Sequence, residues 1–229
     1  MSDVMYPVKF KNLLYWMLEE YESEKRIFNI REEKFYFKPD DTYFEVFGEK
    51  CETPLGPAAG PHTQIAQNIV VAYLTGGRFF ELKTIQILDE LEIEKPCIDA
   101  PDEAYNTEWS TELHVQEAFE EYVKAWFLIH VVAKMLGLTQ GKDRAFVFNM
   151  SVGYDLEGIK SRKVDGFIEG LKDASKTKIF QECKRELKQA IRDGDIPLVT
   201  NEGFVEKISP NISRSITLST MHGSPPEEQ

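Results

Sequence analysis

The sequence predicts an α/β fold in which helices cover a parallel sheet, and three observations support this class. Segments with the pattern of strands and of helices alternate along most of the 229 residues, as they do in parallel sheets with helical crossovers. Hydrophobic residues make up 42% of the chain and aromatic residues 12%, which is enough to fill a core and excludes disorder for most of the chain. The length fits one large domain or two small ones.

The charge balance excludes two classes of partner. The chain has 27 Lys and Arg residues against 39 Asp and Glu residues, a net charge of −12. This acidic balance repels nucleic acids and anionic membranes, so we expect neither as a general partner, although a local basic pocket for a phosphate is compatible with it. No apolar run approaches the roughly 18–20 residues that span a bilayer, so we expect no membrane span.

The cysteines and the N-terminus indicate a cytoplasmic protein. The three cysteines, Cys51, Cys97 and Cys183, are odd in number and widely spaced. No CxxC pair occurs, so no zinc ribbon or iron–sulfur site is assembled locally, and a reducing compartment is the simplest interpretation. The N-terminus lacks the basic start, apolar middle and small-residue cleavage site of a signal peptide.

The first expected element is a helix over residues 7–28. Apolar residues recur in it at steps of three and four, which predicts one buried face, and Pro7 suits the first turn. These residues are Phe10, Leu13, Leu14, Met17, Leu18 and Tyr21. We take residues 1–41 as an N-terminal helical extension and residues 42–229 as the main domain.

A hairpin and a small-residue loop come next. Residues 42–53 fit a short hairpin that turns at Gly48 and supplies the first strand. Residues 53–63 are too rich in glycine and proline for a helix, and small residues in series let a backbone or a flat ligand approach closely. A helix then runs from Thr63, the expected N-cap, to Thr75, and residues 76–77, Gly-Gly, end it.

The remaining elements complete the alternation. By residue number, they are a strand at 78–84, a helix at 110–136, a strand at 145–150, helices at 156–174 and 177–192, and a strand at 214–219. Residues 85–110 are expected to be irregular, because Pro96 and Pro101 block long elements.

The carboxyl ends of the strands are where α/β proteins place their working residues. Residues 58–62, Lys83 with Thr84, residues 149–154 and residues 221–225 follow the four strands in turn. Lys83 ends a buried strand, where a lysine either meets an anionic or carbonyl partner or extends its charged end to solvent. The residues alone leave both readings open.

Known catalytic motifs add little. The sequence contains no Walker, GxGxxG, GxSxG or HExxH pattern. We expect His114 and His130 to be surface or packing residues. His62 and His222 are better placed, each in a Gly/Pro-rich loop after a strand, although a single loop histidine is usually structural.

Several stretches resemble one known family. PLGPAAGPHTQIAQNIV, GGRFFELKTIQ, EKPCIDA, NTEWSTE, FNMSVGYDLEGIK and TLSTMHG closely resemble the N-terminal part of the selenate reductase flavoprotein subunit. Together they span most of residues 45–225. That family is similar in turn to the dihydroorotate and dihydropyrimidine dehydrogenases, whose catalytic domain is an FMN-binding (β/α)8 barrel.

The resemblance implies a flavin-dependent oxidoreductase and a role for each matching residue. Ala58, Ala59 and Gly60 would let the flavin ring lie against the backbone. Lys83, with Thr84 beside it, would stabilise negative charge on the reduced ring. Asn106 resembles an asparagine that contacts flavin or substrate, and Asn149 would face the same cavity. The implied cofactor is FMN, whereas FAD, NAD(P)H and iron–sulfur clusters belong to segments found only in the full-length family.

One departure from the family pattern concerns the catalytic residue. The dehydrogenases carry Asn-x-Ser-(Cys/Ser)-Pro-Asn after the fourth strand, and here residues 221–226 read MHGSPP. Ser224 would align with the catalytic base and His222 lies beside it. Both asparagines are missing, however, which argues against a pyrimidine substrate, and an unactivated serine is a weak base.

The other departure is length. Eight βα units need about 250 residues, so this chain resembles the N-terminal half of a TIM-type (β/α)8 barrel with about four strands. We therefore expect a protein partner or a C-terminal segment to complete the barrel. The alternatives are a non-catalytic interaction subunit, or a truncated fragment that binds a partner through its exposed half-barrel.

Overall fold

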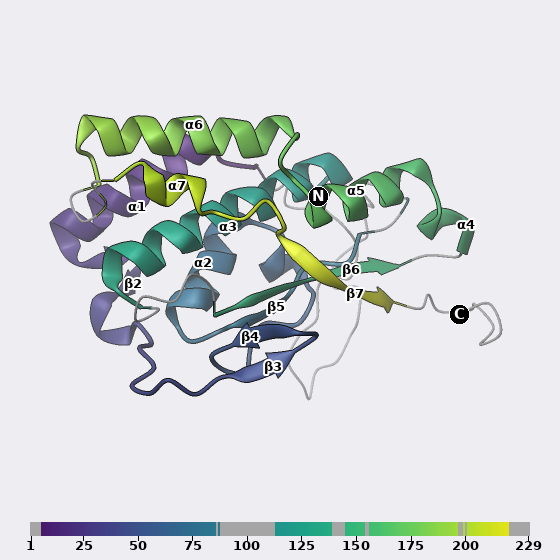
Figure 1. Cartoon of the computed structure of the whole chain (residues 1–229), viewed down its shortest axis with the longest axis horizontal. Helices are drawn as coiled ribbons and strands as arrows, with labels where there is room; N and C mark the ends of the chain where they lie inside the picture. The colour runs from purple at the N-terminus through teal and green to yellow at the C-terminus, as the bar shows by residue number, and fades with distance from the viewer. Residues whose placement is uncertain are drawn as a thin grey trace, which may run out of the picture.

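The computed structural model describes residues 6–85, 87, 113–138, 145–153, 156–196, 199 and 201–219 (Figure 1). Its helices are α1 (Phe10–Glu24), α2 (Ala66–Leu74), α3 (Val115–Leu136), α4 (Leu156–Ile159), α5 (Arg162–Lys172), α6 (Lys178–Asp193) and α7 (Gly203–Glu206), with short 3-10 turns at Glu32–Lys34 and Pro61–Thr63. Its strands are β1 (Arg26–Ile27), β2 (Ile30–Arg31), β3 (Phe44–Val46), β4 (Glu49–Cys51), β5 (Phe79–Glu81), β6 (Val147–Gly153) and β7 (Ser213–Ser219).

The central sheet consists of β5, β6 and β7 in sequential order, and both pairings are parallel. Glu81 pairs with Asn149, and Ser151 pairs with Thr217. An extra residue bulges from β7 opposite Phe148, where the Ser213 hydroxyl donates to the Phe148 carbonyl at 2.6 Å. The structure thus confirms the predicted α/β class with a parallel sheet.

Residues 55–57, Leu-Gly-Pro, run alongside β5 in the parallel direction but form no regular strand. The amides of Phe79 and Glu81 donate to the carbonyls of Leu55 and Pro57 at 3.1 and 3.2 Å. Moving two residues along β5 moves the acceptor two residues along the neighbouring segment in the same chain direction, which is the pattern of parallel pairing. Pro57 has no N–H to return to the ladder, so the pairing is one-sided.

The hairpin is confirmed, but its predicted role as the first strand of the parallel sheet is wrong. β3 and β4 pair only with each other in a two-stranded antiparallel sheet. Phe47 and Gly48 both have positive φ, 50° and 74°, as a two-residue hairpin turn requires. The Glu52 amide donates to the Ala145 carbonyl at 2.9 Å, so the hairpin is fixed across the amino end of β6. Residues 55–57 take the first-strand position instead.

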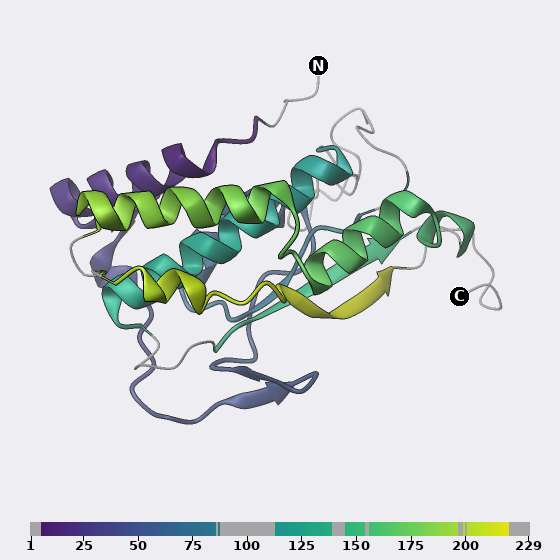
Figure 2. The same cartoon turned by 45° about the horizontal axis from the view of Figure 1, so that its top comes forward.

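Helices cover one face of the sheet. α3 lies against it, with α5 and α6 beside α3 and with α1 along α6 (Figure 2). The Trp126 ring on α3 lies 5.4 Å from the Phe148 ring, and Phe148 lies 5.3 Å from Phe80. Residues of α1 belong to the same hydrophobic cluster as those of α3 and the sheet. This aromatic layer forms the centre of the core.

Two helices begin later than predicted, and for α2 a long-range contact explains the difference. α2 begins at Ala66 rather than at Thr63, because the Glu121 carboxylate accepts the Ala66 amide at 2.7 Å while the Thr63 hydroxyl bonds Gly60. α1 begins at Phe10 with Lys9 as N-cap, three residues after Pro7. The predicted helix end at Gly137 is confirmed, with φ of 65°.

The helix predicted over residues 156–174 is interrupted. It is divided into α4 and α5 at Ser161, whose side chain accepts the Val164 amide at 3.4 Å and so caps α5. The adjoining helix α6 agrees with its prediction, because Thr177 caps its start and Gly194 ends it with φ of 80°.

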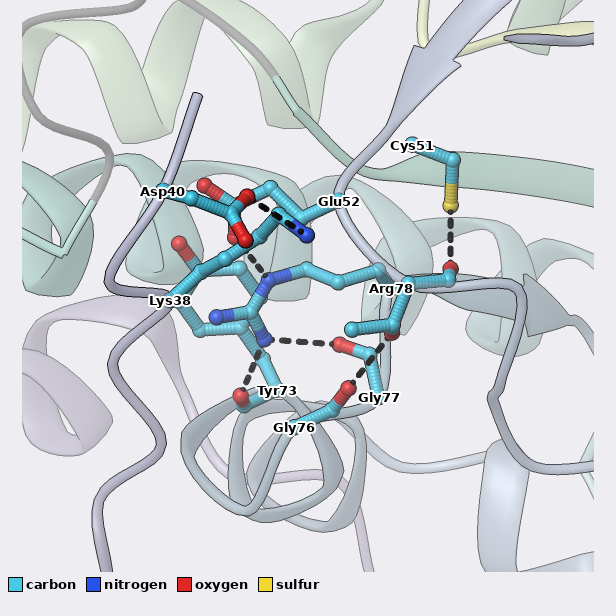
Figure 3. Close-up of polar contacts among 9 residues, drawn as sticks. Lys38, Asp40, Cys51, Glu52, Tyr73, Gly76, Gly77 and Arg78 are labelled. Carbon is cyan, nitrogen blue, oxygen red and sulfur yellow. Dashed lines mark hydrogen bonds and ion pairs between the residues drawn. The ribbon is translucent and has the colours of Figure 1, made fainter. Parts of the chain in front are cut away.

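A buried arginine joins β5, the hairpin and the end of α2 (Figure 3). Arg78 is fully buried, and its Nε donates to Glu52 Oε2 at 2.6 Å. Its Nη1 donates to the carbonyls of Tyr73 and Gly77 at 2.6 and 2.9 Å, and its guanidinium lies 4.0 Å from the centre of the Tyr73 ring. Arg78 therefore holds the hairpin and the end of α2 together at the amino end of β5.

Among the described residues, no helix combines the length and the apolar character that crossing a bilayer requires.

Candidate functional site

The face of the sheet opposite the helices carries polar side chains. Side chains alternate between faces along a strand, and Phe148, Met150 and Val152 of β6 face the helices. Asn149 and Ser151 therefore face the other way. The register adds polar neighbours to this face, namely Glu81 from β5 and Ser215 and Thr217 from β7. A sheet face lined in this way can bind a polar ligand.

Asn149 is the central residue of this polar face. It is 2% exposed, and its Nδ2 donates to the Thr217 hydroxyl at 2.7 Å. Its Oδ1 is buried and accepts no hydrogen bond from any residue that the structure describes. Because a buried acceptor without a donor costs about 1–3 kcal/mol, this oxygen is a ready acceptor for an N–H or O–H group of a ligand.

The end of β5 contributes Lys83 and Thr84. The Thr84 hydroxyl lies 2.9 Å from that of Ser151, on the polar face. Lys83 is 4% exposed. Its charged end therefore does not extend to solvent, which excludes the second of the two interpretations that the sequence left open. The Tyr122 hydroxyl donates to the Lys83 carbonyl at 3.2 Å, and burial raises the pKa of Tyr122 far above its ordinary value. The backbone at Lys83 is thus fixed by a neutral phenol.

The small-residue loop after residues 55–57 approaches the same edge. The Ala59 amide donates to Glu81 Oε2 at 3.1 Å, which ties the loop to β5. The Gly60 amide donates to the Thr63 hydroxyl at 3.2 Å, and that hydroxyl donates to the Gly60 carbonyl at 3.0 Å. A Cβ on Gly60 would lie 2.6 Å from His62 Cε1, so the turn has no room for one without a shift of that ring.

The structure places six of the predicted site residues and leaves three outside its described part. Ala58, Ala59, Gly60, Lys83 and Thr84 lie at or near the carboxyl end of β5. Asn149 was predicted to follow the third strand, but it is the third residue of β6 and pairs with Glu81, so it lies within the sheet. Asn106, His222 and Ser224 lie outside the described residues.

Sequence reasoning missed Glu81 and Thr217, and it gave Ser151, one of residues 149–154, no role of its own. The signal was present, because polar and apolar residues alternate over residues 149–152 and 215–218. Alternation of this kind indicates one polar and one apolar sheet face. It was obscured in β6, where residues on both faces are buried.

Metal binding and thiol chemistry gain no support in the described part of the chain. No group of three or more His, Cys, Asp or Glu side chains there is arranged to hold a metal ion. Cys51 and Cys183 are buried free thiols, and burial raises the pKa of Cys51 to about 11. A thiol with such a pKa is protonated at neutral pH and a poor nucleophile.

Comparison with known proteins identifies relatives along the whole chain. Residues 28–229 match the family model described as "Oxidoreductase YgfK, N-terminal TIM-barrel domain". Proteins named "Putative oxidoreductase YgfK" from Escherichia coli strains K12 and O157:H7 are each 47% identical over 238 aligned positions, which include all of this chain. The chain spans 23% of the length of these relatives. The comparison with solved structures gave no match.

Proposed function

The chain belongs to the family of the N-terminal TIM-barrel domain of oxidoreductase YgfK, and from this premise we propose that it forms the amino-terminal half of the barrel of a flavin-dependent oxidoreductase. In this proposal FMN binds at the carboxyl edge of β5 and β6. TIM-barrel enzymes place their active sites at this edge.

The observation that carries the proposal is the unsatisfied Asn149 Oδ1 on the polar face. The isoalloxazine ring of FMN presents an N–H between two carbonyls, and a buried amide oxygen is a matching acceptor for it. The Asn149 amide is already oriented by its bond to Thr217. Its free acceptor therefore has a defined direction before any ligand arrives.

The surrounding residues fit the same group. Lys83 is a buried cation at the strand end, and a cation beside the ring stabilises negative charge on it. The loop at Ala58, Ala59 and Gly60 offers backbone without large side chains, against which a flat ring can lie. FMN, when bound, supplies the electron-transfer chemistry, and these residues bind the ring, orient it and adjust its charge.

The proposal also extends to the substrate. The family resemblance favours selenate or another oxidised species that accepts electrons from a reduced flavin. His222 and Ser224, which follow β7 in the sequence, are our candidates for proton transfer to the substrate.

Completion of the barrel is also part of the proposal. β7 pairs with β6 along one edge, and within the described residues no strand pairs with its other edge. Ile216 and Leu218 lie on the helix side of β7, yet they are 39% and 54% exposed. We propose that a following segment of a longer polypeptide, or a partner chain, supplies the missing strands and covers these residues.

The test is FMN binding by this chain together with the segment that follows it in the longer relatives. FMN fluorescence is titrated with the unchanged protein and with Asn149→Leu, which removes the acceptor. We expect Asn149→Leu to weaken binding about tenfold or more, as the loss of one buried hydrogen bond does. Gln189→Leu, which removes an exposed amide on α6, is the matched control. Absence of FMN binding by the completed barrel, or equal binding by both variants, would refute the proposal.

A further inference from the structure

A groove lies between α3, α5 and α6, on the helical side of the molecule and away from the polar face of the sheet. α5 lies beside α3 there (Figure 2). The groove has a volume of about 550 Å³, and its lining includes His114, Phe119, Arg162, Gly166, Phe167 and Lys178. This volume is within the range of small-molecule sites, about 300–1,000 Å³.

The rim of the groove is basic in an acidic protein. Arg162, Lys163 and Lys178 line it, and none of its lining residues is acidic, although the chain carries a net charge of −12. Lys163 donates to the Ile87 carbonyl at 3.0 Å. Arg162 and Lys178 form no ion pair with any residue in the described part of the chain. Two cations are therefore available at the rim for an anionic group.

The floor of the groove is apolar. Phe119 of α3 and Phe167 of α5 are buried with ring centres 6.3 Å apart, edge to face. Gly170 allows the helices to approach, since a Cβ there would lie 2.8 Å from the Phe119 ring. Gly166, one turn earlier, faces open space, because nothing lies within 4 Å of the Cβ position. The absence of a side chain at Gly166 keeps the groove open.

We propose that this groove binds a small organic anion, with an apolar or aromatic body on the Phe119–Phe167 floor and a carboxylate, phosphate or sulfonate at Arg162 and Lys178. An arginine guanidinium suits the planar, two-oxygen geometry of such groups. The lining residues of α3, α5 and α6 also include first-turn residues of each helix, where the helix dipole adds positive potential. The site is separate from the proposed flavin site and does not depend on it.

The first test uses 8-anilinonaphthalene-1-sulfonate, an aromatic sulfonate that fluoresces when bound, with the full 229-residue chain at low ionic strength. We expect saturable binding, and we expect Arg162→Ala combined with Lys178→Ala to raise the dissociation constant about tenfold or more. The matched control is Arg214→Ala, which removes an exposed arginine on β7 and should leave it unchanged. The neutral analogue N-phenyl-1-naphthylamine should bind more weakly and be insensitive to all three substitutions.

A second variant pair separates blocked binding from misfolding. Gly166→Leu places a side chain in the groove while improving helix propensity, so it should abolish probe binding and raise the thermal midpoint. Gly166→Ala should raise the midpoint similarly and retain most of the binding. Equal binding of the charged and neutral probes would overturn the proposal. So would unchanged binding of the charged probe in Gly166→Leu or in the Arg162/Lys178 variant.

Discussion

Single residues at the amino end of β5 determine how the hairpin meets the sheet. Arg78 has no exposed surface and directs its guanidinium to one carboxylate and two carbonyls (Figure 3). A buried ion pair adds little to stability compared with apolar residues of the same size, but breaking it leaves an uncompensated charge. The contributions of Arg78 and Glu52 to stability therefore depend on each other, because either side chain alone would be an unpaired buried charge.

We expect Arg78→Leu to destabilise the chain by about 3–5 kcal/mol, because Glu52 is then left charged and buried. Glu52→Leu should have a cost of the same order. The double variant should lose clearly less free energy of unfolding than the sum of the two single losses, since it leaves no unpaired charge buried. Urea unfolding of the four proteins measures this coupling. Additive effects would mean that the two side chains do not depend on each other.

Gly56 illustrates a position where only glycine fits. A Cβ at this position would lie 1.5 Å from the Phe79 carbonyl oxygen, a backbone atom that cannot rotate away. We expect Gly56→Ala to destabilise the chain by about 3 kcal/mol or more, at or beyond the upper end for overpacked sites. Gly166→Ala, in open space on α5, should instead stabilise it by about 0.8–1 kcal/mol. Thermal unfolding of both variants tests the contrast, and similar effects of the two substitutions would contradict it.

At the scale of elements, α3 is the helix around which the others pack, and it carries a buried ion pair. Glu121 and Lys124 form a salt bridge, and both are almost fully buried. Glu121 also accepts the first amide of α2, and Lys124 Nζ donates to the Val8 carbonyl at 2.7 Å, just before α1. One pair thus connects the starts of two other helices to α3.

The cost of breaking this pair should depend on pH. Burial raises the pKa of Glu121 above its ordinary value of 4.5, while Lys124 lowers it. In Lys124→Met the folded-state pKa rises further, so the stability that Glu121 contributes is full below pH 4.5 and is lost as pH rises through the folded-state pKa. We therefore expect Lys124→Met to lower the free energy of unfolding by about 3–5 kcal/mol at pH 8 and by clearly less at pH 5.

Urea unfolding at the two pH values measures this difference. Lys124→Met combined with Glu121→Gln is the control, because it has no buried carboxylate at this position. Its cost relative to the unchanged chain should vary much less between pH 5 and pH 8. A penalty for Lys124→Met that is the same at both values would show that Glu121 does not titrate in this way.

The elements themselves were largely predictable, and their boundaries less so. Local periodicity predicted α1, which buries a regular apolar face. Helices were also expected where α3 and α6 lie, and α3 is buried on nearly all sides. The start of α2 was missed because its cap, Glu121, lies 55 residues away in sequence. The pairing of residues 55–57 with β5 was missed because Gly56 and Pro57 break the local strand pattern.

The candidate site was predictable to the extent that it depends on strand ends. Lys83, Thr84 and the loop at residues 58–60 were located from the alternation of elements alone, whereas Asn149 was expected at the end of a strand and lies within β6. Glu81 and Thr217 were missed because their importance depends on register, and register follows from pairing between distant strands. The roles of Asn106, His222 and Ser224 stay predictions.

At the scale of the whole molecule, large apolar side chains are exposed at several places in the described residues, and two of these places are β7 and the hairpin. Ile216 and Leu218 lie on the helix side of β7. Phe44 and Phe47 lie on the hairpin, and Leu55 lies beside it. Exposed apolar surface next to an open strand edge favours association. In the proposed barrel, both regions would contact the segments that complete it.

We expect the isolated chain to self-associate as its concentration rises. Replacing Ile216 and Leu218 with lysine should reduce this association, and the thermal midpoint should change little because both side chains are already exposed. Sedimentation velocity over a concentration series measures the effect. A lysine pair on α6, at Gln181 and Gln189, is the control for added charge alone. A chain that stays monomeric at all concentrations would argue against an open barrel edge.

The central claim is that this chain forms part of an FMN site, and the most direct measurement is the flavin content of the natural polypeptide that carries it. The protein is purified from its source, its intact mass is determined, and the flavin released on denaturation is identified and quantified. We predict about one FMN per polypeptide, and its selective loss in Asn149→Leu. A protein that contains no FMN, or that keeps its FMN when Asn149 is replaced, would contradict the account.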